Sequence, residues 1–596
     1  MRVINKSPLL EKPISNSKED SEFQIFLGMA RLPQVKRLHV DTESNGQSLK
    51  DGRGYTIGTS IDFAVDESVA YSYYFPFRHK INNISLSYRD ELKELIEKGG
   101  KKIVCHHTRH DMLALRSLGI TCPLDFDDTM LLAHSVDENK LSYRLDYVAK
   151  ELGLPGKARD KHFDQAIKLL GWDGMPPSSM GEYAATDATL LRPIYDHYKP
   201  IYDSEDQTNG ELWEYDKRFM LLLNNIELTG AKVDLELAAR ELERGESRMK
   251  EISKELGLNP GSRNDLEELL ITKLDLPIVK KSKKTDNPSF DKKAMEVYEG
   301  YLEKLNSPVA QLVLEYRGYQ KATSSYWKAY LNHVSPDGRI RPNFNLHRTV
   351  THRLSCDTPN TQQIPRISTK PWHGSVKQGF IAEDGYVLIE ADYSQLEFRL
   401  GAAYAQQTDL IEIFNDPDRD IFTEMSIDLG MLRHDTKTLN YTIQFGGGVT
   451  RISEAFNIPK ENAKFIRDNY FNTYTGFRKI IQMASQTCQG QGFVRTWTGR
   501  RRHFEDPYGE AHKAFNAVIQ GGAADIVKRQ MIRLADAIGW DNPECRMILQ
   551  VHDSIVFEII KGKVEYYSRI IKKVLEDVVP DFGVAFKVDV HEWGKE

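Results

Sequence analysis

The pattern of apolar and polar positions divides the chain into stretches of different character. From Val35 to about residue 200, short apolar runs such as YTIGTSIDFAV alternate with longer helix-like segments, which predicts a mixed α/β domain. Residues 206 to about 335 place Leu, Glu, Lys and Arg at helical spacing and predict helices. Beyond Pro342 the pattern predicts short strands and turns, then helices, then a strand–turn–strand. Residues 1–30 are polar and irregular, so we expect a loose N-terminal arm.

The composition is that of a globular protein with several domains. At 596 residues the chain is too long for a single hydrophobic core, and it is 40% hydrophobic and 28% charged. The net charge of -6 gives no global sign of nucleic-acid binding, but clustered acids at metal sites can mask basic grooves. Five cysteines without a CxxC pair indicate reduced thiols and no zinc site. With no secretion signal and no apolar run of ~18 residues, we expect a cytoplasmic protein.

Acidic residues in the first third of the chain have the spacing of a metal site. VDTES places Asp41 and Glu43 two apart on a predicted strand, so both carboxylates project from one face. Asp111 begins an apolar helix, and Tyr183 and Asp187 lie four apart on one helix face. The D-x-E pair alone is more often a solvated strand end. Together, these acids and the tyrosine suit a hydrolytic site with two Mg²⁺ or Mn²⁺ ions ~4 Å apart.

These segments resemble the DEDD-type 3′→5′ exonucleases, in the subgroup with tyrosine in the last motif. The resemblance implies an RNase H-like domain over residues 31–205. It also implies four metal ligands and a tyrosine that orients the attacking water, namely Asp41, Glu43, Asp111, Asp187 and Tyr183. The second motif departs from the relatives, which usually read N-x-x-Y/F-D, because this chain has His107 and His110 before Asp111. We therefore expect altered contacts to the substrate strand.

Two further aspartates suggest a second metal site. In IEADYSQLEFRLGA an apolar run delivers Asp392 to its end, and in MILQVHDSIVFE a second apolar run carries Asp553. Either aspartate alone is more often a turn residue, but carboxylates from two separate strands are what a two-metal site requires.

Between these aspartates, RHDTKTLNYTIQFGGG carries a stripe of cations and aromatics. Arg433, Lys437, Tyr441 and Phe445 (or Gln444) recur every four residues on one predicted helix face. Cations can neutralise a triphosphate, and an aromatic can stack on a base or sugar. An amphipathic helix with basic ends is the simpler alternative when the stripe is taken alone.

Together these segments closely resemble the three polymerase motifs of family A DNA polymerases, the bacterial DNA polymerase I type. THRLSCDTPNTQQIP, TWTGRRRHF and NAVIQGGAADIVKRQMI follow in the expected order, so the resemblance covers most of residues 340–560. It implies a right-hand polymerase after the exonuclease domain. The implied divisions are a thumb at 206–340, a palm at 341–404 and 516–596, and fingers at 405–515.

The resemblance also implies roles for single residues. Asp392 and Asp553 hold two Mg²⁺ ions, with Mn²⁺ as a possible substitute. Arg433 and Lys437 bind the incoming phosphates, and Lys437 is the candidate general acid for pyrophosphate. Glu397 excludes a ribose 2′-hydroxyl. The implied contacts to primer–template DNA, which suit minor-groove reading, are Arg353, Asn360, Gln363, Asn516, Gln520 and His552.

Several positions depart from the usual pattern of this family, among them Tyr441, Ser554 and His352. Tyr441, in the deoxynucleotide (dNTP) site, stands where bacterial relatives usually carry phenylalanine, which implies weaker discrimination against nucleotides lacking a 3′-hydroxyl. Ser554 follows Asp553 where glutamate is frequent, and His352 replaces the glycine of T-G-R-L-S. The acids and cations are intact, so we expect changes in fidelity and base selectivity before a loss of activity.

The sequence therefore predicts a DNA-dependent DNA polymerase that proofreads, acting as a monomer on primer–template DNA and dNTPs. A nuclease with a degenerate polymerase half and a non-catalytic nucleic-acid-binding subunit are disfavoured by the intact acids, and an RNA polymerase by Glu397. Only about 35 residues precede the exonuclease segment, which leaves no room for a 5′→3′ nuclease domain and favours a phage replication enzyme.

Overall fold

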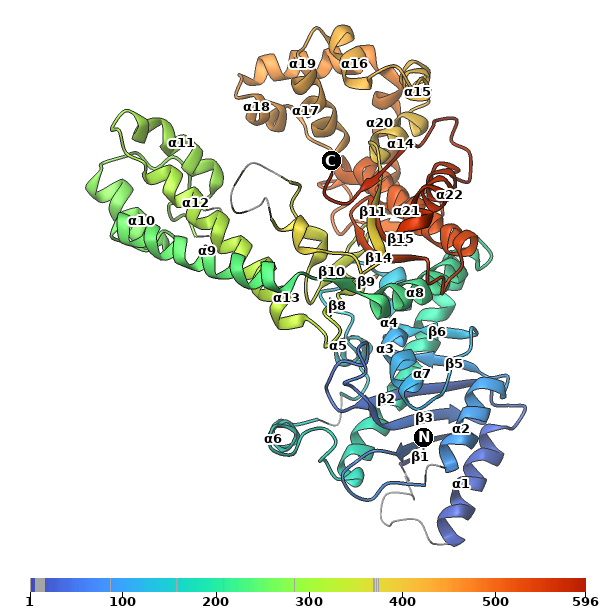
Figure 1. Cartoon of the computed structure of the whole chain (residues 1–596). Coiled ribbons are helices and arrows are strands. Elements are labelled where there is room, and N and C mark those ends of the chain that lie inside the picture. Colours follow the sequence, from blue (N-terminus) through green and yellow to red (C-terminus); the bar gives the residue numbers. More distant parts are fainter. Residues whose placement is uncertain are drawn as a thin grey trace.

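The chain folds into two blocks joined by long helices. The computed structural model describes residues 2–5, 17–85, 87–156, 159–206, 208–282, 285–367, 370, 372 and 375–595. The N-terminal block lies at the bottom of Figure 1, and the larger C-terminal block lies above it, with a helical arm extending to one side. Within the described residues no helix is long and apolar enough to cross a membrane.

The N-terminal block is built on a six-stranded mixed sheet with strand order β1-β4-β3-β2-β5-β6. Its strands β2, β3 and β4 pair antiparallel, whereas β2, β5 and β6 pair parallel. Nearly every residue of β3 is buried because helices cover both faces of the sheet. The strands are β1 (Arg2–Asn5), β2 (Arg37–Ser44), β3 (Thr56–Ala64), β4 (Val69–Pro76), β5 (Lys102–Cys105) and β6 (Phe126–Asp128). The helices are α1 (Ser17–Ala30), α2 (Ser87–Lys98), α3 (Thr108–Ser117), α4 (Thr129–Val136), α5 (Leu145–Glu151), α6 (Lys161–Leu170) and α7 (Pro177–Glu205).

The prediction of a loose arm over residues 1–30 is wrong for residues 17–30. Residues 17–30 form helix α1, whose Phe23, Phe26, Leu27 and Ala30 are buried in the core of the sheet domain. Their i, i+3, i+4, i+7 spacing makes one apolar stripe, and the Phe26 ring lies 4.9 Å from that of Phe75 on β4. Residues 2–5 form β1 and pair with β4, and residues 6–16 lie outside the described residues.

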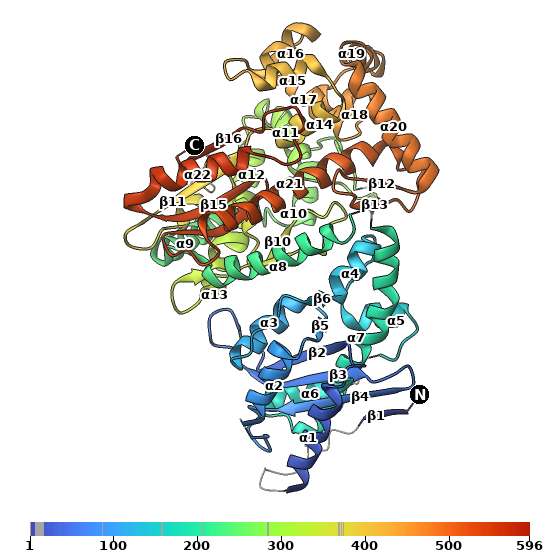
Figure 2. The ribbon, with the colours of Figure 1, turned by 90° about the vertical axis from the view of Figure 1, so that its right-hand side faces the viewer.

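The helices predicted after residue 206 form two separate structures. Helix α8 (Glu211–Thr229) packs beneath the C-terminal block, against β14 and α21, and links the two blocks (Figure 2). The helices that follow project as an arm, with a second small core that includes Leu270, Tyr298 and Leu302. The arm contains α9 (Leu235–Leu256), α10 (Arg263–Glu267), η2 (Glu268–Lys273), α11 (Lys292–Glu303), α12 (Val309–Lys321), η3 (Ala322–Trp327) and α13 (Lys328–His333).

The C-terminal block is built on a four-stranded antiparallel sheet of order β14-β15-β11-β16. Its strands are β11 (Tyr386–Tyr393), β14 (Cys545–Val551), β15 (Ser554–Ile560) and β16 (Val588–Glu592). Helices α21 (Ala514–Ile538) and α22 (Val564–Glu576) pack together beside this sheet. A helical group rises above it, formed by α14 (Leu396–Tyr404), α15 (Thr408–Asn415), α16 (Ile421–Leu429), α17 (Arg433–Gln444), α18 (Val449–Phe456), α19 (Lys460–Thr473) and α20 (Thr475–Gln491).

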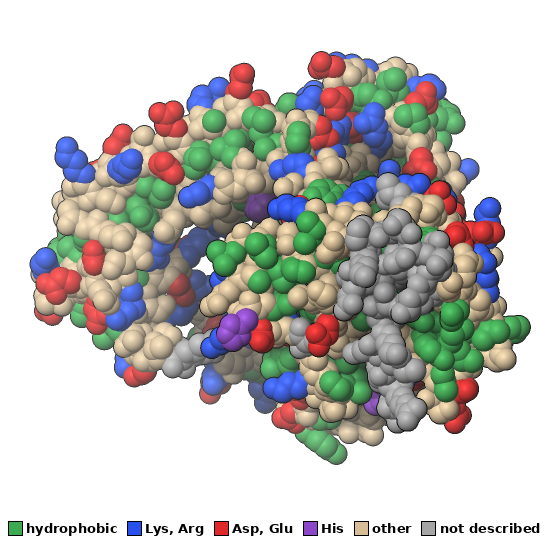
Figure 3. All heavy atoms as spheres, turned by 90° about the horizontal axis from the view of Figure 1, so that it is seen from below, with side chains coloured by type: hydrophobic (Ala, Val, Ile, Leu, Met, Phe, Trp, Pro, Cys, Tyr) green, Lys and Arg blue, Asp and Glu red, His purple; other side chains and the backbone are tan. Residues whose placement is uncertain are grey.

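Short elements complete the C-terminal block. They are β7 (Ala231–Lys232), β8 (Arg339–Ile340), β9 (Asn343–Asn345), β10 (Ser355–Asp357), β12 (Phe493–Arg495), β13 (Arg501–His503), η4 (Thr361–Gln363), η5 (Lys377–Gly379), η6 (Ala511–Lys513) and η7 (Lys561–Lys563). Seen from below, the molecule is hollowed between the arm and the main body, and Lys and Arg side chains line the hollow (Figure 3).

Two buried glutamates join the blocks. Glu227 of α8 pairs with Arg109 of α3 and, at 2.7 Å, with the Lys50 ammonium. In the opposite direction, Glu138 of the N-terminal block accepts a hydrogen bond from the backbone N–H of His503 at 2.5 Å and pairs with Arg502 at 3.0 Å. In each case, basic side chains from one block therefore neutralise a buried carboxylate from the other side.

Helix α1 provides a test of this fold. Phe26→Ala removes a fully buried ring and should destabilise the sheet domain by about 3–5 kcal/mol. The neighbouring Ile25 is 56% exposed, so Ile25→Ala should change the stability by no more than about 0.5 kcal/mol. Hydrogen exchange of the β4 amides would measure both effects. Equal exchange in the two variants would show that α1 does not belong to this domain.

Two candidate metal sites and their surroundings

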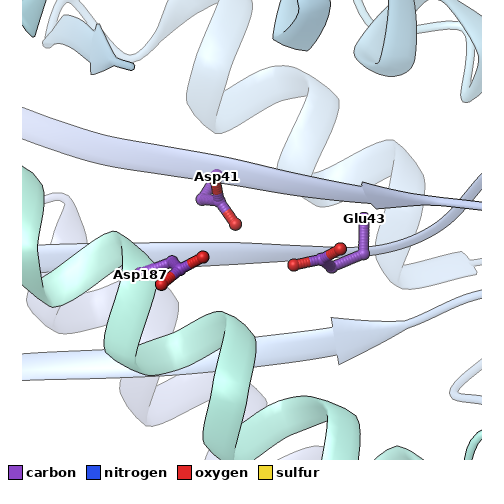
Figure 4. Close-up of side chains that lie close together, drawn as sticks. All are labelled: Asp41, Glu43 and Asp187. Carbon is purple, nitrogen blue, oxygen red and sulfur yellow. The ribbon is translucent and has the colours of Figure 1, made fainter. Parts of the chain in front are cut away.

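Three carboxylates converge in the N-terminal block. Asp41 and Glu43 project from the same face of β2, and Asp187 faces them from α7 (Figure 4). One ligand oxygen from each of the three lies within 4.8 Å of the others. The sequence analysis grouped four acids, and the structure brings three of them together: Asp41, Glu43 and Asp187. Hard oxygen donors at this separation fit Mg²⁺ or Mn²⁺.

Tyr183 lies on α7 one turn before Asp187, as its spacing predicts. Its side chain is buried. Burial first, and then the nearby charges of Glu43, Asp187 and Asp41, raise the pKa of the phenol well above its ordinary value. The hydroxyl is therefore protonated at physiological pH and can hydrogen-bond to a water at the acidic cluster.

Asp111 occupies the first turn of α3 but does not join the group of three. Its Oδ1 accepts a hydrogen bond from Thr42 Oγ1 at 2.8 Å. Thr42 lies between Asp41 and Glu43 on β2. Burial and the charge of Asp41 raise the pKa of the Asp111 carboxyl well above its usual range. Asp111 is therefore electrostatically linked to the cluster while it is hydrogen-bonded to the strand.

The altered second motif has a structural consequence. His107 is the N-cap residue of α3 with φ 68°, and its ring lies 6.0 Å from that of His347 in the C-terminal block. Burial lowers the pKa of His107 well below its ordinary value, so its imidazole is neutral. His110 is exposed. The second motif thus reaches the C-terminal block through His107.

In the C-terminal block, Asp392 and Asp553 come from adjacent strands. Asp392 lies near the end of β11 and pairs in register with Ser554, the first residue of β15. Asp553 occupies the two-residue turn between β14 and β15, and His552 in that turn has φ 56°. The expected strand–turn–strand is confirmed, and its register brings the two aspartates together.

Crowded negative charge marks this second cluster. Burial, Glu390 and Asp553 raise the pKa of Asp392 to about 6, while Arg366 opposes the shift. The pKa of Asp553 is also raised by burial, against the opposing charge of Arg353. A bound cation would relieve this repulsion, so the donor set fits divalent metal ions.

Glu397, Arg353 and Tyr441 lie around these acids. The Arg353 guanidinium pairs with Glu397 and approaches Asp553 Oδ1 at 3.8 Å. Burial, then the charges of Glu397 and Asp553, raise the pKa of Tyr441 to about 12. Tyr441 of the predicted stripe therefore lies near these acids.

The cationic part of the stripe lies farther along α17. Arg433 donates two hydrogen bonds of 2.8 Å to Asp420, and the Lys437 ammonium lies 5.7 Å from the centroid of the Phe422 ring. Arg433 precedes Tyr441 by eight residues, or about 12 Å along a helix axis. The structure thus places Arg433 in a pair with Asp420 at the far end of the stripe.

The predicted DNA contacts have varied surroundings. Arg353 and His552 line a small cavity together with Asp553 and Lys528. Lys528 was not predicted, and burial and Arg500 lower the pKa of its ammonium to about 8. The other candidates occupy η4 and α21: Asn360 caps η4, Gln363 is exposed at its end, and Asn516 and Gln520 lie four apart on α21.

Glu390 is a functional candidate that the sequence analysis missed. Its Oε1 accepts a hydrogen bond of 3.0 Å from Ser554, and its Oε2 accepts one of 2.7 Å from Lys377. A carboxylate from β11 thus contacts the side chain at position 554, where the family frequently has glutamate. Glu390 and Asp392 lie two apart on a strand and project from one face, as Asp41 and Glu43 do. This spacing could have identified Glu390 from the sequence.

The other departure, His352, also has a local explanation. This residue has φ 56°, the left-handed region that favours glycine, which accounts for the glycine usual at this position. The histidine is buried, and its ring lies 4.6 Å from that of His134 in the N-terminal block.

Comparisons with known proteins agree with this two-block arrangement. Residues 20–202 match the family model described as 3′-5′ exonuclease. Residues 231–595, more than half of the chain, match the model described as DNA polymerase family A. The chain belongs to DNA polymerase family A.

Individual relatives are bacterial enzymes. The chain is 32% identical to the thermostable DNA polymerase I of Thermus aquaticus over 504 residues. The aligned residues cover 80% of this chain and 56% of that protein. It is 28% identical over 528 residues to DNA polymerase I of Bacillus subtilis, covering 83% and 58%. The chain thus spans a little over half the length of these relatives.

A solved structure shares the fold. The POL domain of Pol1 from M. smegmatis, determined in complex with a DNA primer-template and dNTP, superposes with a TM-score of 0.79 over 96% of this chain and 97% of that chain. The sequence identity is 23%, so this likeness shows the fold alone.

The crowding around Asp392 predicts a pH-dependent stability of the metal-free protein. Its pKa of about 6 exceeds the ordinary 3.8, so the folded state binds the proton more tightly than the unfolded state. Ionisation of Asp392 therefore destabilises the folded protein. This destabilisation grows as the pH rises from about 4 to about 6, and it is complete above about pH 6.

Asp392→Asn should therefore be about 1–3 kcal/mol more stable than wild type at about pH 8, with the gap closing toward about pH 4. Denaturant titrations in a chelator at several pH values would measure this. The exposed Asp384→Asn is the control and should match wild type throughout. A gap that does not change with pH would contradict the assignment.

Proposed function

We propose that the chain is a template-directed, DNA-dependent DNA polymerase with a 3′→5′ proofreading exonuclease. The observation that carries this proposal is the presence of two separate acidic clusters, one in each block. The first contains Asp41, Glu43 and Asp187, and the second contains Asp392 and Asp553. Family membership and the exonuclease match support the same assignment.

At the exonuclease site, Asp41, Glu43, Asp187 and Asp111 would hold the metal ions. Bound ions supply an activated water and stabilise the departing 3′-oxyanion. Tyr183 orients this water through its protonated hydroxyl. Asp111 can act only after its carboxyl turns from Thr42 toward the cluster, which an added cation would favour by offsetting the charge of Asp41.

At the polymerase site, Asp392 and Asp553 would hold two Mg²⁺ ions, or Mn²⁺. Bound ions lower the pKa of the primer 3′-hydroxyl and stabilise the pyrophosphate that leaves. Arg433 and Lys437 bind the triphosphate, and Lys437 protonates the pyrophosphate. Because Arg433 is paired with Asp420, nucleotide binding requires exchange of this pair for a phosphate.

The remaining candidates position the nucleotide and the DNA. Glu397, held by Arg353, excludes a ribose 2′-hydroxyl, and Tyr441 contacts the sugar. Residues 206–340 act as a thumb, 405–515 as fingers, and 341–404 with 516–596 as a palm. The proposed primer–template contacts are Arg353, Asn360, Gln363, Asn516, Gln520 and His552. The lysines and arginines of the hollow in Figure 3 support a DNA path between arm and body.

We further propose that the enzyme acts as an intracellular monomer on primer–template DNA. The phage replication role stays a prediction, since the relatives named above are bacterial.

The two activities should separate by mutation. On a primer with a mismatched 3′ end, Asp41→Ala should extend but lose trimming by about 10³-fold or more, because a metal ligand is removed. Asp392→Ala should trim but not extend. Gel analysis of primer length would measure both. If Asp392→Ala still extends primers, the polymerase-site assignment is wrong.

The proposed ribose gate has its own test. Glu397→Ala should raise ribonucleotide incorporation relative to deoxynucleotides by about 10- to 100-fold, because the side chain that meets the 2′-hydroxyl is removed. Single-nucleotide kinetics would give the ratio. Glu412→Ala, an exposed change on α15, should leave the ratio at the wild-type value. An unchanged ratio in Glu397→Ala would remove the gate assignment.

A further inference from the structure

Helix α3, which carries Asp111, is held between the two blocks. In Figure 2 it lies beneath α8, the helix that links them. Arg109 and Asp111 both lie in the first turn of α3, and two residues of a helix are ~200° apart around its axis. The two side chains therefore point in nearly opposite directions. Asp111 meets Thr42 of β2, and Arg109 meets Glu227 of α8.

The Arg109 guanidinium is bound by residues that lie outside the exonuclease domain. It is buried and pairs with Glu227. Its Nε donates a hydrogen bond to Asn224 Oδ1 at 3.1 Å, and its Nη1 donates to the backbone carbonyl of Phe344 in β9. A planar guanidinium with several acceptors is held in one orientation. The first turn of α3 is therefore tied to α8 and β9.

The same carboxylate also holds the strand side of the acidic cluster. The loop that follows β2 brings the Lys50 ammonium to Glu227 at 2.7 Å, and this ammonium also donates to Asn343 Oδ1 at 2.6 Å. Glu227 thus connects two segments of the exonuclease domain. One is the loop after the strand that carries Asp41 and Glu43, and the other is the helix that carries Asp111.

The start of α3 is fixed from outside the helix. His107, its N-cap residue, makes no capping hydrogen bond through its side chain. Asp128, at the end of β6, instead accepts a hydrogen bond from the backbone N–H of Thr108 at 2.7 Å. Asp128 and Glu227 therefore hold the turn in which Asp111 lies.

We propose that Glu227, acting through Arg109, is a positioning residue of the exonuclease site and sets how far Asp111 lies from the other three acids. The proposal rests on the proposed exonuclease function. Asp111 is hydrogen-bonded to Thr42 and reaches a metal ion after only a small movement, so a shift of α3 changes whether it can do so. Residues that hold a metal ligand in place typically change metal affinity or activity by 10- to 100-fold. A carboxylate of α8 thus completes a site of the N-terminal block.

A purely structural role for Glu227 gives a different expectation. Glu138 is the matched control, because it is also a buried glutamate that joins the blocks, and neither it nor its partner Arg502 belongs to α3. A structural role predicts similar effects of Glu227→Gln and Glu138→Gln. A positioning role predicts that only Glu227→Gln affects the exonuclease site.

A second variant guards against misfolding of Glu227→Gln, which leaves two buried cations without their carboxylate. In Arg109→Met, Glu227 stays paired with Lys50, so no buried charge is left alone. Thermal unfolding establishes which variants fold, and Arg109→Met decides the matter if Glu227→Gln does not.

The first test measures metal binding by the full chain. Mn²⁺ is titrated and followed by electron paramagnetic resonance in a background of Asp392→Asn with Asp553→Asn, which leaves the N-terminal cluster. Glu227→Gln and Arg109→Met should each raise the Kd for Mn²⁺ about 10-fold, whereas Glu138→Gln should keep the value of the background protein. An unchanged Kd in Arg109→Met overturns the proposal.

The second test measures trimming of a mismatched 3′ end by the chain with an intact polymerase cluster. In Glu227→Gln and Arg109→Met, kcat should fall about 10- to 100-fold while KM for the strand stays near the wild-type value, because a metal ligand is misplaced. Raised Mn²⁺ should restore part of the rate, and extension of a matched primer should be unchanged. Equal losses of trimming in Glu227→Gln and Glu138→Gln would show a structural role.

The positioning role and the proposed function fail in distinguishable ways. Trimming by the wild type is measured first. If the wild type does not trim, the exonuclease function is wrong and the positioning role falls with it. If the wild type trims, and Arg109→Met binds Mn²⁺ and trims as the wild type does, only the positioning role is wrong.

Discussion

The repulsion between clustered carboxylates is the constraint on which the rest of this structure depends. In each block, backbone geometry brings acids together against their mutual repulsion, and burial strengthens that repulsion, as the raised pKa values of Asp111 and Asp392 indicate. Such clusters are costly unless cations bind them. The surrounding elements, a buried β-strand and a packed helix in one block and a β-hairpin beside β11 in the other, are rigid enough to hold the acids in place.

Much of each site could be predicted because local geometry determines it. Alternation along a strand fixes the relation of Asp41 to Glu43, and helical spacing fixes that of Tyr183 to Asp187. What the sequence could not provide is the packing between distant segments. Three side-chain hydrogen bonds depend on such tertiary contacts: Thr42 to Asp111, Arg433 to Asp420, and Ser554 to Glu390. Helix α1 was missed because polar residues outnumber its single apolar stripe.

The two sites belong to one chain whose blocks are fastened by buried charges. Arg109 lies two residues before Asp111 and pairs with Glu227 of α8. Helix α3, which carries Asp111, is therefore anchored on the helix that packs beneath the C-terminal block. Glu138 provides the reciprocal contact. Removing one partner of such a pair leaves an uncompensated buried charge, which disfavours separation of the blocks. The two acidic clusters are therefore held in a fixed relation to one another.

The central claim is that each acidic cluster is an independent site for divalent ions. Titration of Mn²⁺ followed by electron paramagnetic resonance tests this directly, using wild type, Asp41→Asn with Asp187→Asn, and Asp392→Asn with Asp553→Asn. We predict that each double variant loses its own set of bound ions and keeps the other, and that the combined variant loses both. If either double variant binds as many ions as wild type, or if one pair of changes abolishes both sets, the account is wrong.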